Sequence, residues 1–174
     1  MLTNRRTSNL EVVGYSDSDY AECLVTRKST FGYLFLLADG AISWKSGKQS
    51  VIATSTMEAE FVACFEATIQ SKWLRNFIGG LGIVDTIAKP MRIHCDNSAA
   101  VFFSRNDRYT KGAKHMDIKY LSVKEEVQNQ GVQIVHIGTK EMVADPLTKG
   151  LTPKIFIGHV GNMGVVDRAL YFGY

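Results

Sequence analysis

Short apolar segments recur along the chain between polar stretches, and they predict the strands of an α/β protein. Five such segments are rich in β-branched and aromatic residues, which is typical of strands. They cover residues 10–16, 30–38, 41–45, 91–95 and 132–137. The Asp39-Gly40 pair lies between the second and third segments, so we expect those two strands to form an antiparallel hairpin.

Apolar residues at helical spacing predict one long helix in the middle of the chain. Ser55-Thr-Met-Glu58 matches a capping box at its start, and Gly79-Gly80 is the expected end. The apolar positions between them are Phe61, Val62, Phe65, Ile69 and Trp73. A short helix over residues 97–104 and a charged amphipathic helix over residues 114–130, followed by Gly131, are predicted further along.

A last helical turn is predicted around Asp145. Pro146 suits the first turn of a helix, which places Asp145 near an N-cap, and a helix that begins at Glu141 is the alternative. The resulting order, β-β-β-α-β-α-α-β-α, predicts a mixed sheet with hairpin strands on one side and parallel strands joined by helical crossovers on the other. We expect one α/β domain over residues 1–164, followed by a C-terminal tail, residues 165–174, that carries no motif.

The composition narrows the class of protein only slightly. With 174 residues, 45% of them hydrophobic, the chain suits one globular domain. The net charge of +3 is too small to indicate nucleic-acid binding by itself. Three cysteines without a Cys-x-x-Cys pair argue against a disulfide framework and a zinc site, and no apolar run reaches the roughly 20 residues that span a bilayer. We therefore expect a soluble protein in a reducing intracellular setting.

Four acidic residues, each in a distinctive local sequence, are candidates for a metal site. Asp17 and Asp96 follow predicted strands, Glu58 lies at the start of the long helix, and Asp145 lies in the last turn. In open α/β sheets, ligands collect beyond the carboxyl ends of the strands, so we expect these acids at one edge of the sheet. Clustered carboxylates repel one another, and Mg²⁺ takes oxygen ligands. The set therefore predicts a magnesium-binding catalytic site formed by Asp17, Glu58, Asp96 and Asp145.

Three of these acids also have a structural interpretation. Asp17 suits a turn, and Asp19 is the alternative acid in either role, although strand alternation favours the one nearer the strand end. Asp96 and Asp145 each suit an N-cap for the segment that follows. Each acid alone is ambiguous, and the case for a site depends on their expected meeting at one edge of the sheet.

Glu58 competes with Glu60 for the metal role. Residues 58 and 60 lie about 200° apart around a helix, so both cannot face the sheet. Glu58 also suits the capping box, in which it would bond back to Ser55. We expect Glu58 to face the sheet, because it shares a stripe with the apolar residues of the helix.

Basic residues occur in small groups that suit phosphate contacts, with solvated surface faces as the alternative. In Arg27-Lys28-Ser29-Thr30 and Lys111-Gly-Ala-Lys-His115, the charges alternate with hydroxyl or glycine residues. His136 lies in a predicted strand and is expected to be a packed or edge histidine. The candidate nucleic-acid contacts are Arg27, Lys28, Ser29, Asn97, Lys114, His115 and Lys119.

Seven motifs follow one another along the chain. They are Gly14-Tyr-Ser-Asp-Ser-Asp-Tyr20, Thr26-Arg-Lys-Ser-Thr-Phe-Gly-Tyr33, Ile42-Ser-Trp-Lys-Ser46, Thr54-Ser-Thr-Met-Glu-Ala-Glu60, Cys95-Asp-Asn-Ser-Ala-Ala100, Lys114-His-Met-Asp-Ile-Lys119 and Ala144-Asp-Pro-Leu-Thr-Lys-Gly150. Together they resemble the ribonuclease H domain at the end of the Pol polyprotein of copia-type LTR retrotransposons, especially those of plants. The resemblance implies a ribonuclease H-like fold, with a five-stranded mixed sheet flanked by helices.

The same resemblance implies an activity. It is that of an endonuclease which hydrolyses the RNA strand of RNA–DNA hybrids during reverse transcription, with two Mg²⁺ ions, or Mn²⁺ in their place. Carried over position by position, the metal-binding acids of the family are Asp17, Glu58, Asp96 and Asp145. The implied partners are the hybrid and the reverse transcriptase domain of the same polyprotein, without a membrane. The implied location is the cytoplasm, including virus-like particles.

One departure and two alternatives accompany the resemblance. Cellular ribonucleases H carry a histidine in the loop before the last acid, and residues 138–143 contain none, so a lower turnover is expected. A retroelement remnant that binds nucleic acid without cutting it is the main alternative. An integrase or transposase core is the other, but its acids run Asp, Asp, Glu, with the glutamate on a late helix, whereas here the glutamate comes second.

Overall fold

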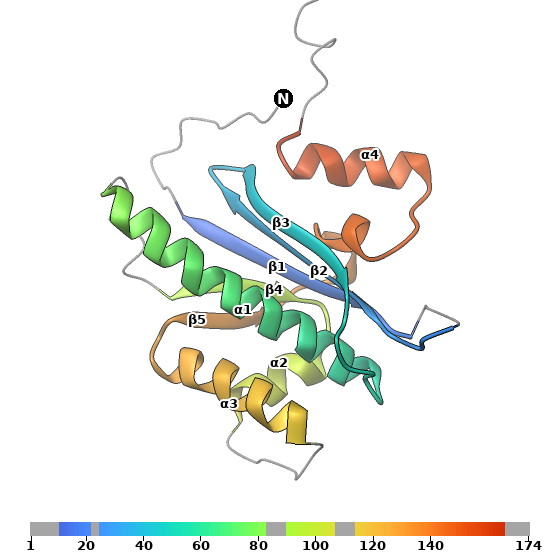
Figure 1. Ribbon diagram of the computed structural model, residues 1–174. Coiled ribbons are helices and arrows are strands. Elements are labelled where there is room, and N and C mark those ends of the chain that lie inside the picture. The colour runs from blue at the N-terminus through green and yellow to red at the C-terminus, as the bar shows by residue number, and fades with distance from the viewer. Residues whose placement is uncertain (1–10, 22–24, 83–89, 107–113, 166–174) are drawn as a thin grey trace, which may run out of the picture.

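Five strands form a single mixed sheet in the computed structural model, which describes residues 11–21, 25–82, 90–106 and 114–165 (Figure 1). The strands are β1 (Val12–Asp19), β2 (Thr30–Leu37), β3 (Gly40–Lys48), β4 (Met91–Cys95) and β5 (Val132–His136). Their order in the sheet is β3-β2-β1-β4-β5. β2 is antiparallel to both β1 and β3, whereas β4 is parallel to both β1 and β5. The predicted mixed sheet is therefore confirmed.

Helices cover the two faces of this sheet unequally. The helices are α1 (Thr56–Leu81), α2 (Ser98–Arg105), α3 (Lys114–Gln128) and α4 (Pro153–Asn162), with two short 3₁₀ helices, η2 (Thr139–Glu141) and η3 (Asp145–Leu147). The main hydrophobic core lies between the sheet and α1, α2 and α3. A smaller cluster joins β2 and β3 to the segment around η3 and α4, which Figure 1 shows apart from α1. None of the described helices is both long and apolar enough to cross a membrane.

Three element boundaries differ from the predictions. β1 continues to Asp19, so Asp17 lies inside the strand and not after it. The long helix α1 passes through Gly79-Gly80 and ends at Leu81, before Gly82 with a φ of 63°. A glycine within a helix costs only about 1 kcal/mol, which the rest of a 26-residue helix easily outweighs. The helix α4 was not predicted, although Pro153 at its first position is a start signal.

The caps also differ from the two that were considered. Asn97, and not Asp96, is the N-cap of α2, and its side chain accepts a hydrogen bond from the N–H of Ala100. Asp145 lies within η3, whose N-cap is Ala144. Asp96 and Asp145 are therefore free of the capping role that competed with the metal role. Residues 166–174 of the predicted tail lie outside the described residues.

Candidate active site

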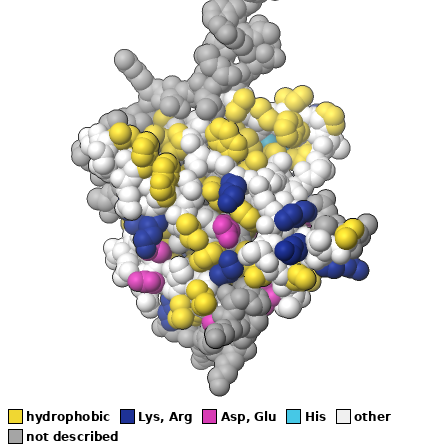
Figure 2. All heavy atoms as spheres, viewed as in Figure 1, with side chains coloured by type: hydrophobic (Ala, Val, Ile, Leu, Met, Phe, Trp, Pro, Cys, Tyr) yellow, Lys and Arg dark blue, Asp and Glu magenta, His cyan; other side chains and the backbone are white. Residues whose placement is uncertain are grey.

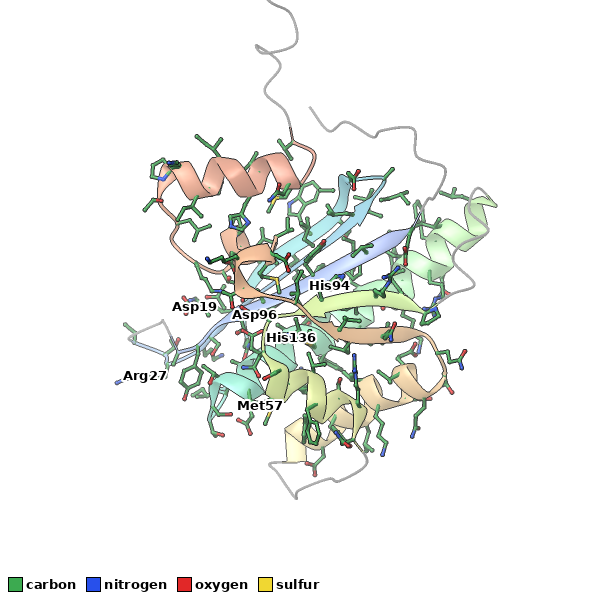
Figure 3. The ribbon with its side chains drawn as sticks, turned by 180° about the vertical axis from the view of Figure 1, so that it is seen from behind. Asp19, Arg27, Met57, His94, Asp96 and His136 are labelled. Atoms are coloured by element: carbon green, nitrogen blue, oxygen red, sulfur yellow. The ribbon has the colours of Figure 1, made fainter. Side chains whose placement is uncertain are left out.

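Two adjacent parallel strands carry two of the predicted acids to one end of the sheet. The pairing of β1 with β4 runs from Val13 opposite Arg92 to Tyr15 opposite His94. Asp17 and Asp96 each lie two residues beyond the last of these pairs. Figure 3 shows Asp96 at this end of the sheet. The expectation that Asp17 and Asp96 meet at the carboxyl ends of neighbouring strands is confirmed.

The third member of the cluster is Glu60 of α1. Carboxylate oxygens of Asp17, Glu60 and Asp96, one from each residue, all lie within 4.8 Å of one another. Asp17 is completely buried and Glu60 is 7% exposed. The backbone N–H of Ser18 donates a hydrogen bond of 3.2 Å to Oε1 of Glu60, which ties the helix to the end of β1. Three elements therefore place three carboxylates around one small volume.

The prediction that Glu58 faces the sheet in preference to Glu60 is wrong. Oε2 of Glu58 accepts hydrogen bonds from the backbone N–H and the hydroxyl of Thr54, at 2.6 and 2.7 Å. The backbone N–H of Glu58 bonds in turn to Oγ of Ser55, the N-cap residue, at 3.2 Å. Glu58 thus performs a capping function at the start of α1, as its alternative interpretation required.

Small residues explain why α1 turns Glu60 inward. The buried stripe of the helix continues from Glu60 through Cys64, Ala67, Ser71, Leu74 and Ile78, which all lie within about 40° of one another at 100° per residue. Most of these side chains are short, so the helix approaches the sheet closely. Two of the large apolar residues used for the prediction, Ile69 and Trp73, are 50% and 54% exposed. They belong to the apolar patch that Figure 2 shows over the C-terminal half of α1.

The surroundings of Glu60 make its ionisation unfavourable. Burial is the main cause, the neighbouring Cys95, Asp17 and Asp96 add to it, and the N–H of Ser18 opposes it. Together they raise the pKa of Glu60 from 4.5 to about 10. A proton on Glu60 therefore relieves the repulsion within the cluster at neutral pH. A divalent cation between the same oxygens would do so more effectively, since it would let all the carboxylates remain ionised.

Asp145 joins the site through η3, on the other face of β1. Its Oδ1 accepts a hydrogen bond of 2.8 Å from Nζ of Lys149, which also lies 3.1 Å from Oδ1 of Asp17. The hydroxyl of Thr148 donates to the other oxygen of Asp17, Oδ2. Burial raises the pKa of Asp145, with contributions from Asp17 and Asp96, while Lys149 acts to lower it. Asp145 is thus electrostatically coupled to the other two aspartates.

A glycine on β2 allows η3 to approach Asp17. Gly32 is the direct cross-strand partner of Asp17. A Cβ atom placed on Gly32 would lie 2.8 Å from Cβ of Leu147 and 2.8 Å from Cγ2 of Thr148. Since real Cβ atoms do not approach other atoms so closely, any larger residue at position 32 would displace the end of η3. The absent side chain of Gly32 is therefore part of the geometry of the site.

The predicted nucleic-acid contacts around the β1–β2 connection fall into two groups. Arg27 and Lys28 are exposed, and Figure 3 shows Arg27 at the tip of this connection, beyond Asp19. Ser29 is completely buried, and its Oγ accepts a hydrogen bond of 3.1 Å from the N–H of Ala21. The prediction that Ser29 contacts nucleic acid is therefore wrong, because its side chain holds the connection together from inside.

The remaining predicted contacts lie on the helices. Asn97, next to Asp96, is partly exposed and caps α2. Nζ of Lys119 lies 3.6 Å from Oε1 of Glu66 and 3.9 Å from the centre of the Phe65 ring, and the Lys119 side chain is only 12% exposed. Its ammonium group is engaged with α1, which argues for a structural role. The side chains of Lys114 and His115 are outside the described part of the structure.

His136 adds a neighbour to the site. It ends the edge strand β5, is exposed, and places Nε2 3.2 Å from the backbone carbonyl oxygen of Asp96 (Figure 3). The edge interpretation of this histidine is confirmed. Four residues of the site were not selected from the sequence, namely Gly32, Glu60, Thr148 and Lys149. All four belong to the quoted motifs, and that membership was the available signal.

Comparisons with known proteins agree with this geometry. A retrovirus-related Pol polyprotein from transposon TNT 1-94 of Nicotiana tabacum is 39% identical over 136 residues, which are 78% of this chain and 10% of the relative. One from transposon RE1 of Arabidopsis thaliana is 31% identical over 161 residues, 92% of this chain and 11% of the relative. The chain thus spans about a tenth of the length of these relatives. No family model matches the chain.

Solved structures with the same fold are ribonucleases H and a viral reverse transcriptase. LC11-RNase H1 in complex with an RNA/DNA hybrid is similar with a TM-score of 0.56 and 17% identity, over 79% of this chain and 94% of that one. The foamy viral protease–reverse transcriptase in complex with an RNA/DNA hybrid is similar with a TM-score of 0.54 and 15% identity, over 85% of this chain and 21% of that one.

The chain is a ribonuclease H-like domain related to transposon Pol polyproteins. The resemblance stated from the motifs is thereby confirmed, as is the ribonuclease H-like fold. In this domain the three clustered carboxylates come from the ends of β1 and β4 and from the first turns of α1. The ribonuclease H-like domain therefore gathers its acidic residues where its two central parallel strands end.

Proposed function

We propose that this ribonuclease H-like domain is a Mg²⁺-dependent endonuclease that hydrolyses the RNA strand of RNA–DNA hybrids during reverse transcription. The observation that carries the proposal is the buried cluster of Asp17, Glu60 and Asp96, with Asp145 coupled to it across β1. A structural role alone would not explain why three carboxylates are gathered with so little exposure and why one of them retains a proton. A catalytic divalent cation accounts for both features.

The chemistry of these residues fits the cation. Asp17, Glu60 and Asp96 supply hard oxygen ligands from three separate elements, and Asp145 is the fourth candidate ligand. When bound, two Mg²⁺ ions, or Mn²⁺ in their place, would activate a water molecule and stabilise the leaving 3′ oxygen. The hydrogen bond from Ser18 holds Glu60 in place. The hydroxyl of Thr148 orients Asp17.

Exposed groups near the site suit the backbone of a hybrid. Arg27 and Lys28 on the β1–β2 connection offer charges for phosphates, and Asn97 offers an amide beside Asp96. Contacts with 2′-hydroxyl groups in the wide minor groove would distinguish RNA from DNA, so sequence preference is expected to be slight. Because the relatives are about ten times longer, a reverse transcriptase domain of the same polyprotein is the proposed partner. The cytoplasmic location, including virus-like particles, stays a prediction.

Two glutamates on α1 provide a matched test. Glu60→Gln and Glu58→Gln each remove one negative charge from the same helix, two residues apart. A labelled RNA–DNA hybrid, a matching RNA duplex and a matching DNA duplex are incubated with each protein and Mg²⁺ or Mn²⁺, and products are separated by size. We expect cleavage of the hybrid alone, a loss of more than about a hundredfold in Glu60→Gln, and a rate within a fewfold of the original in Glu58→Gln.

Other outcomes would refute parts of the proposal. Loss of cleavage in Glu58→Gln, with Glu60→Gln active and both proteins folded, would show that Glu58 and not Glu60 serves the reaction. A folded protein that binds the hybrid and cuts none of the substrates with either metal ion would refute the nuclease. That result would favour a catalytically silent, retroelement-derived remnant.

A further inference from the structure

The ammonium group of Lys149 lies between two of the acids assigned to metal binding. It is 2.8 Å from Oδ1 of Asp145 and 3.1 Å from Oδ1 of Asp17. The Asp17 side chain has no exposure and that of Asp145 is 12% exposed, whereas the Lys149 side chain is 33% exposed. The lysine therefore enters from the surface and places its charge against two largely buried carboxylates.

The backbone fixes this position of Lys149. Its N–H donates to the carbonyl oxygen of Asp145 at 2.9 Å, so the turn of η3 continues into the lysine. Thr148, the preceding residue, bonds to Asp17 through its hydroxyl. The hydroxyl of Ser46 on β3 donates to the carbonyl oxygen of Leu147 at 2.5 Å, which fastens η3 to the sheet. A surface lysine that met the acids by chance would not be held by three successive residues bound to the sheet and to Asp145.

The oxygens that Lys149 contacts are those a cation would require. Oδ1 of Asp17 and Oδ1 of Asp145 both face the ammonium group, and Oδ2 of Asp17 is taken by Thr148. A metal ion that bound Asp17 and Asp145 through these oxygens would have to displace the lysine, because two cations cannot share the same short contacts. Occupancy by Lys149 and occupancy by a metal ion at these atoms therefore exclude each other.

We propose that Lys149 is a built-in counter-cation, which holds Asp17 and Asp145 together in the metal-free protein and competes with the divalent ion for them. This inference rests on the proposed metal-dependent function. Lys149 acts here as a positioning residue, because it works through the two aspartates. Without its charge, the metal-free site loses a stabilising contact, while the divalent ion no longer has to displace an ammonium group. Stability and metal affinity should therefore change in opposite directions.

Four variants of the full chain test this competition. Lys149→Met removes the charge and keeps the length of the side chain, and Lys149→Gln removes the charge but keeps a hydrogen-bond donor. Lys149→Arg keeps the charge. Lys140→Met removes a charge from the exposed residue Lys140 of η2 and controls for the change in net charge. Binding of Mn²⁺ alone is measured by calorimetry, and thermal unfolding is measured in chelator and with Mn²⁺.

We expect Lys149→Met to bind Mn²⁺ about tenfold more tightly, within the range typical of coupling between two bound species, and to unfold at a lower temperature in chelator. Lys149→Gln should change both quantities in the same directions and provides the result if the methionine variant does not fold. Lys149→Arg and Lys140→Met should stay close to the original protein. A merely structural lysine would give a lower unfolding temperature together with weaker metal binding.

Two results would overturn the inference. Mn²⁺ affinity that is unchanged or weaker in both charge-removing variants would show that Lys149 does not compete with the metal ion. The proposed nuclease would survive that result if the hybrid is still cut and Glu60→Gln is still inactive. Absence of Mn²⁺ binding in every protein, including the original, would refute the metal site itself, and the inference would fall with the proposed function.

Discussion

Replacing Glu60 by glutamine should stabilise the metal-free protein at neutral pH, although it removes a residue at the centre of the proposed site. The pKa of Glu60 is raised from 4.5 to about 10, chiefly by burial. A carboxyl group whose pKa is raised by folding binds a proton in the folded state at a pH where the unfolded chain has released it. Folding must then take up that proton, so the free energy of unfolding falls as the pH rises from about 4.5 towards about 10.

The magnitude follows from the same shift. Within this window, one proton per molecule is released on unfolding, so stability falls by about 1.4 kcal/mol for each pH unit. Between pH 6 and pH 8 the Glu60 contribution therefore falls by up to about 3 kcal/mol. Below the unfolded pKa of 4.5, both states are protonated and the contribution is absent. Glutamine cannot ionise, and its side-chain oxygen can still accept the hydrogen bond from Ser18.

The assay is urea unfolding in chelator, followed by circular dichroism at several pH values between 5 and 8. We expect the difference in stability between Glu60→Gln and the original protein to grow with pH in favour of the variant. The matched Glu58→Gln should instead lose about 0.5–2 kcal/mol because it weakens the cap of α1. With Mg²⁺ present, the original protein should gain more stability than Glu60→Gln. A difference between Glu60→Gln and the original that does not change with pH would refute the reasoning.

Two further predictions concern positions around the site. Gly32→Ala should lower the free energy of unfolding by about 1–3 kcal/mol through overpacking, and it should weaken Mn²⁺ binding because it pushes Thr148 away from Asp17; a variant as stable as the original protein in urea would contradict this. Arg27→Ala combined with Lys28→Ala should weaken hybrid binding and lower its salt dependence by about 1 per phosphate contact. Ser29→Ala should instead reduce stability by about 1–3 kcal/mol through a buried unsatisfied N–H without changing hybrid affinity, and fluorescence anisotropy at several salt concentrations separates the two.

Much of the fold was predictable because it depends on short-range patterns. Strands of alternating or continuous apolar residues, the Asp39-Gly40 hairpin and the β-β-β-α-β order are local features, and the mixed sheet follows from them and from the handedness and length of crossovers. Asp17 and Asp96 were likewise predictable, because a residue near the carboxyl end of a strand is placed at the sheet edge by the strand itself.

The helical acid was not predictable in this way. Periodicity shows that Glu58 and Glu60 face opposite directions, but not which of them faces the sheet. Large apolar residues such as Trp73 drew the prediction to the wrong side, because hydrophobicity was taken as a measure of burial. The helix instead turns its small residues, such as Ala67, towards the sheet, since close packing of backbones leaves no room for large side chains there.

The sequence by itself determined the strands, their order and the two aspartates at their ends, because each of these depends on neighbours along the chain. Tertiary structure alone decided that Glu60 completes the cluster, that Ser29 is buried, and that Lys149 lies between Asp17 and Asp145. These outcomes depend on how closely two elements distant in sequence approach each other. That approach is governed by the volumes of the side chains on both surfaces, as at Gly32, and a pattern read along one chain does not contain it.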